Sequence, residues 1–201
     1  MPSQGERRTA TRRRILDAAR ALLVERGADG ATIAAVLDHA GVSRGAMYHH
    51  FASKGDLVAA VVEATSAEAI SAAARSVPAD LPPREALVAG CRAWLAEVCE
   101  PDVAAILFEA GPTVLGWERC RRIEDDNSLR LMRLSLRAAV SAGQLDVPSV
   151  DLTARVLNAA LSELALVVVH GEPEVSDLAV AALVVERLVE GLIDGVGRAG
   201  R

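Results

Sequence analysis

Apolar residues recur at the 3.6-residue spacing of an α-helix in nearly every segment of this chain, and no stretch alternates convincingly between apolar and polar residues. The pattern is clear between Thr11 and Arg26, where the apolar positions are Ile15, Ala18, Ala19, Leu22 and Leu23. We therefore expect an all-α protein of about nine helices. The expected helices cover about 11–26, 32–39, 42–49, 53–75, 83–99, 101–111, 115–142, 150–170 and 174–196.

Capping and breaking residues set these limits. Thr32 can cap the second helix, and Ser53 with Asp56 fits a capping box at the start of the fourth. Gly27 is expected to end the first helix, and the pair Gly111-Pro112 is expected to end the sixth. The polar run 124–128 predicts a kink in the seventh. Residues 77–83 form the clearest linker, since three of the seven are proline.

Composition excludes several classes of protein. The N-terminus lacks the apolar stretch of a signal peptide, and no uninterrupted apolar run approaches the ~20 residues that span a bilayer. The three cysteines are an odd number without metal-ligand spacing, and the chain has no glycine-rich phosphate loop. We expect no metal, no cofactor, no catalytic activity and no membrane association, and we place the protein in the cytoplasm.

The charge is divided unevenly along the chain. Residues 1–56 contain nine basic and six acidic side chains, a net charge of +3. The whole chain has 22 basic and 27 acidic side chains, so the remainder carries a net charge of −8. This asymmetry is typical of a small polyanion-binding domain attached to an acidic body, although a solvated basic surface would read the same way.

The segment 41–57, GVSRGAMYHHFASKGDL, concentrates the rare residues of the chain. Two of the five aromatic side chains, two of the four histidines and the only lysine lie in these seventeen positions. The glycine at its start separates two short expected helices, which together form a helix-turn-helix. In that motif the N-terminal part of the second helix lies nearest the DNA bases.

The residue types in this segment suit contacts with DNA. Arg44 can donate two hydrogen bonds to guanine, Ser43 can cap the helix or touch DNA, and Gly45 permits close approach. We expect Tyr48, His49 and Lys54 to reach phosphates, with Thr32 at a neighbouring helix start. The arginines at positions 7–14 could reach flanking phosphates or the minor groove. Met47 and Phe51 are expected in the core, whereas His50 fits either packing or a phosphate.

The stretch from Thr11 to about Val62 resembles the N-terminal DNA-binding domain of the TetR family of bacterial transcriptional regulators. The most specific elements are Ala40-Gly41-Val42-Ser43, Tyr48 with His50-Phe51, and Ser53-Lys54 followed by Asp56-Leu57. The resemblance implies a homodimer on a palindromic operator in double-stranded DNA, a dimer interface formed by the last two helices, and a ligand pocket between. It also assigns DNA contacts by position to Thr32, Ser43, Arg44, Tyr48, His49 and Lys54.

One position departs from the usual helix-turn-helix pattern. Four residues before the turn glycine these motifs usually carry alanine, because the two helices cross closely there, and this chain has Leu37. Either the crossing angle adjusts or the pattern is shifted by one residue.

The last two expected helices are apolar on more than one face, so a monomer would expose a large apolar patch. We expect a four-helix bundle between two subunits; the alternative is a helix pair buried within one subunit. The expected interface residues are Leu157, Leu161, Leu164, Val168, Leu183, Arg187 and Leu188.

The remaining aromatic side chains lie in the middle helices, where large rings can line a lipophilic cavity or simply fill a core. The candidate ligand-pocket residues are Cys91, Trp94, Leu95, Phe108, Glu109, Trp117, Cys120, Met132 and Leu136. Of the acidic groups, Glu97, Glu109 and Glu163 are expected to face inward, which would favour a cationic lipophile. We expect His170 and Asn158 to form hydrogen bonds at the subunit interface rather than contact ligand.

Together these features predict a ligand-responsive transcriptional regulator, most simply a repressor released by a lipophilic small molecule. Residues 1–56 would form the DNA-binding domain and residues 57–201 the ligand-binding and dimerisation domain. The main alternative is an all-helical protein-interaction scaffold that does not bind DNA.

Overall fold

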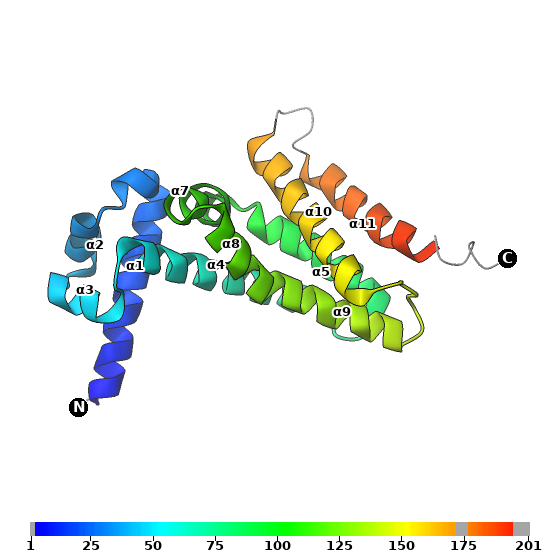
Figure 1. Cartoon of the computed structure of the whole chain (residues 1–201), viewed down its shortest axis with the longest axis horizontal. Helices are drawn as coiled ribbons and strands as arrows, with labels where there is room; N and C mark the ends of the chain where they lie inside the picture. Colours follow the sequence, from blue (N-terminus) through cyan, green and yellow to red (C-terminus); the bar gives the residue numbers. More distant parts are fainter. Residues whose placement is uncertain (1–2, 172–176, 195–201) are drawn as a thin grey trace. The chain divides into compact units, whose positions relative to one another are not determined.

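The computed structural model describes residues 3–171 and 177–194, with side chains through Gly191, and all regular structure in this part of the chain is helical. The elements are α1 (Gln4–Gly30), α2 (Ile33–Ala40), α3 (Arg44–His50), α4 (Lys54–Ser76), α5 (Pro83–Val98), α6 (Pro101–Ala104), α7 (Gly111–Leu115), α8 (Trp117–Glu124), α9 (Arg130–Ser141), α10 (Val150–His170) and α11 (Leu178–Asp194). Two π-helical segments, Ala105–Ala110 and Asp125–Leu129, join α6 to α7 and α8 to α9. The described residues therefore contain nine continuous helices (Figure 1), and the predicted all-α fold is confirmed.

The chain forms two compact units. The first unit comprises Met1–Thr65 and Pro101–Ile123, and the second comprises Ser66–Glu100 and Glu124–Arg201. The predicted boundary at residue 56 separates a DNA-binding domain from a ligand-binding domain. The two units are defined by compactness alone, so this functional boundary stays a prediction.

The core of the first unit is built around α1. The predicted apolar positions of this helix are all buried, with Ile15, Leu22 and Leu23 at most 1% exposed. They share one cluster with Met47, which is fully buried, and Phe51, which is 4% exposed. Both of these side chains were predicted to be core residues. The cluster holds α2 and α3 against α1 through apolar contact, the main stabilising force in a small helical unit.

Helix α1 begins seven residues before its predicted start. Ser3 caps it: its side chain accepts from the backbone N–H of Glu6, whose carboxylate accepts from the backbone N–H of Ser3 at 2.5 Å. Apolar periodicity missed this extension because residues 3–10 are all exposed. Gly27 breaks the helix as predicted, with a φ of 65°, and one further turn follows it.

The helix that begins at Pro101 does not end at Gly111-Pro112, so that prediction was wrong. The backbone N–H of Gly111 donates to the carbonyl of Ile106, five residues back, and this wider π-type turn carries the helix past the proline. Gly111 is needed because an added Cβ would lie 2.9 Å from the Ile106 carbonyl oxygen and 3.1 Å from Val62. The helix ends instead at Gly116, where φ is 75°.

The next helix begins at Trp117 and passes through the π-helical segment Asp125–Leu129. This segment coincides with the polar run for which a kink was predicted. Gly143, with a φ of 67°, follows the last turn as expected. The helix predicted over 174–196 is present as Leu178–Asp194, and the predicted limits lie outside the described residues.

The second unit is a bundle in which α5 packs against α9, α10 and α11, and α10 also packs against α9 and α11. Among the described residues, two helices, α4 and α10, are long and apolar enough to cross a membrane by length and composition alone, a test that core helices also pass. In α10 only 28% of the relevant stretch is buried, so much of this apolar helix is uncovered in the single chain.

Candidate functional site

Helices α2 and α3 form a helix-turn-helix whose turn depends on Gly41. This glycine is left-handed, with φ 60° and ψ 44°, and the backbone N–H groups of Gly41 and Val42 donate to the carbonyls of Asp38 and Leu37. Leu37 itself is half-buried and packs against the core cluster. The turn therefore closes with leucine at the position where alanine is usual.

Both helices of the motif have side-chain caps at their N-terminal ends. The Thr32 hydroxyl accepts from the backbone N–H of Ala35 at 3.2 Å. The Ser43 hydroxyl accepts from the backbone N–H of Ala46, also at 3.2 Å, so α3 begins at Arg44, two residues later than predicted. Each cap satisfies an N–H group that would otherwise lack a partner, and Thr32 and Ser43 are both exposed at these helix ends.

The surface of α3 separates core residues from candidate DNA contacts. Met47 points into the core, whereas Arg44, Gly45, Tyr48 and His49 are exposed. Tyr48 leaves 45% of its surface accessible although it is a large ring, and nothing lies within 4 Å of a Cβ built on Gly45. Four of the predicted contacts thus share an open surface on one short helix.

Lys54 has a structural role that sequence reasoning missed. Its ammonium group donates to the carbonyl oxygen of Ala28 at 2.7 Å, which ties the first residue of α4 to the turn that follows Gly27. An ammonium has three N–H donors, so this bond leaves two for another acceptor such as a phosphate.

The arginines of α1 divide into two groups. Arg14 donates to the carbonyl oxygens of Ala40 and Gly41 and so caps the C-terminal end of α2. The Arg12 guanidinium lies 5.2 Å from the centre of the Phe51 ring. These two arginines contact the motif directly, and Arg7 and Arg8, on the first turns of α1, are exposed as they are.

The pKa of His50 responds to the positive charges around it on this surface. The pKa of its imidazole is lowered, first by partial burial of the ring and then by the positive charges of His49, Arg8 and Arg12. Three side chains, those of His49, Arg8 and Arg12, therefore lie close enough to disfavour a proton on His50. Such a cluster also attracts an anion.

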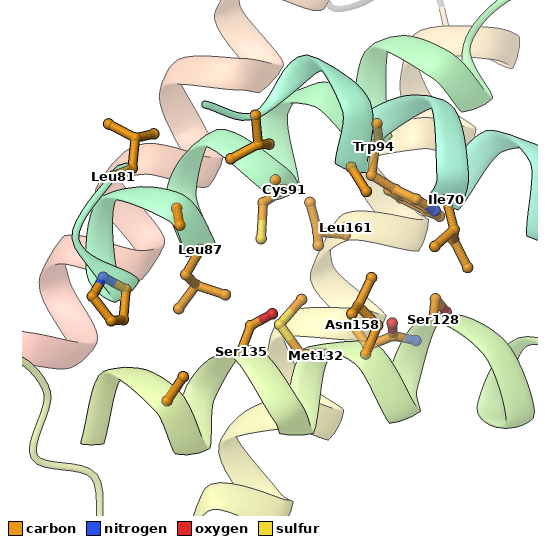
Figure 2. Close-up of a pocket in the computed structure, with 18 of the residues that line it drawn as sticks. Ile70, Leu81, Leu87, Cys91, Trp94, Ser128, Met132, Ser135, Asn158 and Leu161 are labelled. Carbon is orange, nitrogen blue, oxygen red and sulfur yellow. The ribbon is translucent and has the colours of Figure 1, made fainter. Parts of the chain in front are cut away.

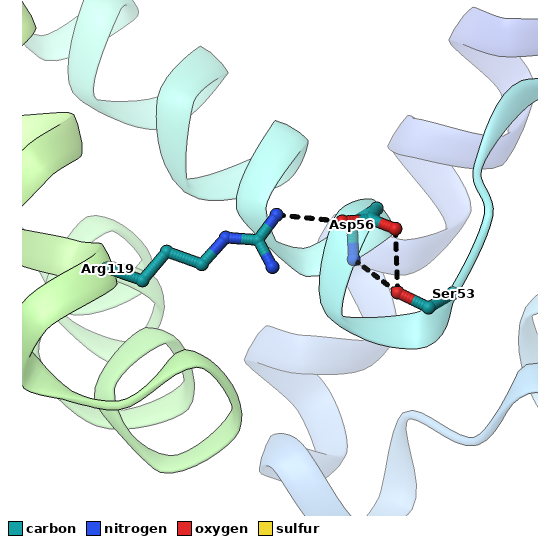
Figure 3. A network of polar contacts seen from close by, with 3 residues as sticks. All are labelled: Ser53, Asp56 and Arg119. Carbon is teal, nitrogen blue, oxygen red and sulfur yellow. Dashed lines mark hydrogen bonds and ion pairs between the residues drawn. The ribbon is translucent and has the colours of Figure 1, made fainter.

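The start of α4 is joined to α8 by a polar network (Figure 3). The Ser53 hydroxyl accepts from the backbone N–H of Asp56 at 3.1 Å and donates to its carboxylate at 2.8 Å. The other oxygen of Asp56 accepts from Arg119 at 2.8 Å. These bonds, led by the one from Arg119, lower the pKa of Asp56. The predicted Ser53 cap is confirmed, and Arg119 was missed because it is 63 residues away in sequence.

The second unit contains a cavity of about 500 Å³ (Figure 2), which is within the usual range for small-molecule sites. Three predicted pocket residues line it: Cys91 and Trp94 on α5, and Met132 on α9. Leu95 and Leu136 are buried in the same two helices without lining it. Residues that periodicity did not indicate complete the wall, including Ile70, Leu81, Leu87, Leu131 and Leu161.

The other predicted pocket residues lie elsewhere. Phe108, Glu109, Trp117 and Cys120 belong to the first unit, and Trp117 is 56% exposed. They do not line this cavity because the chain folds 101–123 into the first unit. Of the acidic groups expected to face inward, Glu109 and Glu163 are exposed and Glu97 is half-buried, and none of the three lines the cavity.

The residues with polar side-chain groups that line the cavity include Ser128, Ser135, Asn158 and Trp94, whose indole carries an N–H. Asn158 is 8% exposed, and its amide nitrogen donates to a carboxylate oxygen of Glu124 at 2.8 Å. The Ser162 hydroxyl donates to the same oxygen. Asn158 is thus a residue of the cavity wall rather than the interface residue that was predicted, while His170 is exposed at the end of α10.

The thiol of Cys91 faces this cavity as an uncharged group. Burial raises its pKa to about 12, which leaves it protonated at neutral pH and poorly nucleophilic. The wall therefore offers a soft apolar surface rather than a reactive thiolate.

Helix α11 carries an uncovered apolar surface on the second unit. Val180, Leu183, Val184, Arg187 and Leu188 recur at helical spacing and are all exposed. On α10, Leu152 and Val156 are more than 60% exposed, and Leu164 and Val168 are half-buried. Leu157 and Leu161 differ from the prediction: they are 3% and 5% exposed in the single chain, because α10 packs against α5, α9 and α11.

A helix-turn-helix whose second helix is exposed, joined to a larger helical unit, is the architecture of a DNA-binding regulator. The comparisons identify the family. Residues 15–61 match the tetR family of bacterial regulatory proteins, and residues 84–192 match the tetracyclin repressor-like C-terminal domain. The chain belongs to the TetR family of bacterial transcriptional regulators.

Individual relatives agree with this assignment. The HTH-type transcriptional repressor AcnR of Corynebacterium glutamicum is 39% identical over 63 residues, which are 31% of this chain and 34% of AcnR. A TetR-family regulator of Pectobacterium atrosepticum is 26% identical, with a TM-score of 0.79 over 96% of this chain and 98% of that one. RolR in complex with resorcinol is 19% identical, with a TM-score of 0.71 over 92% and 90% of the two chains.

Proposed function

We propose that this regulator is a cytoplasmic homodimeric repressor that binds a palindromic operator and dissociates from it when a lipophilic small molecule enters the cavity. One observation carries the DNA-binding part: Arg44, Tyr48 and His49 are exposed on a helix whose opposite side is anchored by fully buried Met47. A rigidly held recognition helix with a donor at its first turn is suited to reading base edges.

Base and phosphate contacts would be divided among these residues. Arg44 would donate to guanine O6 and N7, with Ser43 beside it and Gly45 allowing close approach. Tyr48, His49 and the two remaining donors of Lys54 would bind phosphate oxygens, as would exposed Thr32. The positive charges of His49, Arg8 and Arg12 around His50 favour a nearby polyanion and so support phosphate contacts on this surface.

The dimer would form through α10 and α11. The exposed side chains Leu183, Val184 and Leu188 form one stripe on α11, and Leu152 and Val156 extend the apolar surface on α10. Two copies of this surface can cover one another about a two-fold axis and form a four-helix bundle. In the dimer the two recognition helices would lie about one DNA turn apart, ~34–36 Å.

The cavity would bind the effector. Apolar side chains dominate its wall, so burial of apolar surface would drive binding. The structure of RolR contains resorcinol, but at 19% identity the likeness extends only to the fold. The ligand class proposed for this chain is argued from its own cavity. Ligand would favour a conformation in which the two half-sites cannot both be reached, and repression would be lifted as a population shift.

Fluorescence anisotropy with duplex DNA from the promoter of its own gene, at several salt concentrations, tests the DNA-binding part. We expect the affinity to fall steeply with salt because phosphate contacts release counterions. A duplex of scrambled sequence is the matched control. Affinity that does not respond to salt, or equal affinity for both duplexes, would contradict sequence-specific regulation and favour the scaffold alternative.

A further inference from the structure

The polar end of the cavity restricts the chemical class of ligand that it can accept. Figure 2 shows Ser128 and Asn158 toward one end and Leu81 toward the other. Every residue that lines the cavity is uncharged, within the described part of the chain. A carboxylate or an ammonium placed here would lose its hydration without gaining an opposite charge, which is strongly unfavourable.

Glu124 sets the orientation of the Asn158 amide. A carboxylate can only accept hydrogen bonds, so the Asn158 side chain must present its nitrogen to Glu124, at 2.8 Å. The Ser162 hydroxyl donates to the same carboxylate oxygen and holds it in place. The amide cannot turn over without bringing two oxygens together.

This arrangement leaves the Asn158 carbonyl oxygen as an acceptor. Within the described residues no protein donor reaches this oxygen, although the side chain is only 8% exposed. This oxygen is not among the fully buried side-chain atoms that lack a partner, so it is accessible, and a ligand that brings a donor to it gains a hydrogen bond. The hydroxyl groups of Ser128 and Ser135 can rotate to donate to a ligand or to accept from it, so they do not favour a ligand donor over a ligand acceptor.

We propose that the effector is an uncharged lipophile with a hydroxyl group, or another uncharged donor, that binds the Asn158 carbonyl oxygen. The proposal rests on the proposed ligand-responsive function and replaces the cationic lipophile expected from sequence. Glu124 acts as a positioning residue, because it fixes which atom of Asn158 the ligand meets. The Cys91 thiol, also in the wall, is protonated and leaves binding non-covalent.

Calorimetric titration with two series of probes tests this proposal without DNA. One series is 1-octanol, methyl octyl ether, octanoate and octylammonium; the other is 2-naphthylmethanol, its methyl ether, 2-naphthoate and 2-naphthylmethylammonium. We expect at least one alcohol to bind. Its affinity should exceed that of its methyl ether by about fivefold, the difference that one net hydrogen bond makes to a dissociation constant. The charged compounds should bind at least about tenfold more weakly than that alcohol.

Three variants separate recognition from simple burial. Asn158→Leu removes the acceptor, and Glu124→Gln frees the amide to present either atom, since glutamine can donate or accept. In both variants the alcohol and the ether should bind within about twofold of each other, less than one net hydrogen bond gives. Ser141→Ala, at the exposed end of α9 and outside the cavity wall, should keep the wild-type preference. Circular dichroism confirms folding, and Glu124→Gln keeps the test valid if Asn158→Leu does not fold.

Several results would overturn the proposal: tighter binding of a charged compound than of its alcohol, no binding by either alcohol, or an unchanged preference in Glu124→Gln. Operator binding is measured separately. If alcohols bind as described but operator affinity stays constant, the ligand class stands and ligand-responsive repression fails. If a charged compound releases the operator, regulation stands and the ligand class fails.

Discussion

The recognition helix and the cavity are both candidate binding sites, but they are built in opposite ways. On α3 the functional side chains are exposed within a few consecutive residues, and buried Met47 holds them in place. The wall of the cavity is assembled from residues that are far apart in sequence, from Ile70 to Leu161. The Asn158 amide, which Glu124 orients, belongs to a buried side chain. One site is a local surface and the other is a product of packing. Substitutions should therefore act by different routes in the two regions.

The largest effect is expected at the apolar surface of α11. Leu183→Glu with Leu188→Glu places charges on a surface that we propose to be buried between subunits, and sedimentation should show monomers. Loss of the second half-site should weaken operator binding by about 10²-fold or more. The matched control is the same exchange at exposed Leu134, which lies on α9. An unchanged mass in the double variant would contradict the bundle.

Met47→Ala tests whether the core of the first unit supports the exposed surface. Met47 is fully buried, and its truncation leaves a cavity that costs about 2–5 kcal/mol of unfolding free energy. Denaturant unfolding measures the loss. Tyr48→Ala, one residue along and 45% exposed, should change stability by about 0.5 kcal/mol or less. Equal losses in the two variants would show that α3 is not anchored as described.

Arg44→Ala and Lys54→Met separate base reading from phosphate binding. Arg44→Ala should cost about 1–3 kcal/mol on operator DNA and relax sequence preference. Lys54→Met should weaken all sequences alike and reduce the salt slope by about one. It also removes the 2.7 Å bond to the Ala28 carbonyl, so its stability is measured alongside. Identical behaviour of the two variants in anisotropy titrations would refute the division.

The smallest effect concerns the pH dependence of stability. Asp56 has a lowered pKa in the folded chain, so its contribution is present above its ordinary value of 3.8 and is lost as the pH falls through the folded value. Arg119→Ala should therefore flatten the decline in stability below about pH 4. The effect is modest because the two side chains are 39% and 42% exposed to screening solvent. Thermal melts between pH 3 and 7 measure it, and an unchanged slope would contradict the assignment.

Sequence reasoning succeeded where the deciding interactions are local. The caps at Thr32, Ser43 and Ser53 join residues three positions apart, so spacing alone reveals them. It failed at Gly111-Pro112, because a π-type turn depends on packing around Gly111 rather than on the residue types alone. It did not anticipate that Phe108 and Trp117 belong to the first unit, since an aromatic residue in a middle helix can belong to either unit.

The amino-acid sequence alone determined that this chain is helical and where its caps and turn glycines lie, because these features act over three to five residues. Its motifs resembled the TetR family, and from them came the prediction that residues 41–57 contact DNA. Only the tertiary structure decided which side chains meet across longer separations. Arg119 reaches Asp56 across 63 residues, and Asn158 reaches Glu124 across 34. These pairs depend on how helices pack, and packing depends on the shapes of all the contacting side chains together. For that reason the helix-turn-helix that carries the proposed DNA contacts was predictable, whereas the shape of the cavity and the orientation of the Asn158 amide were not.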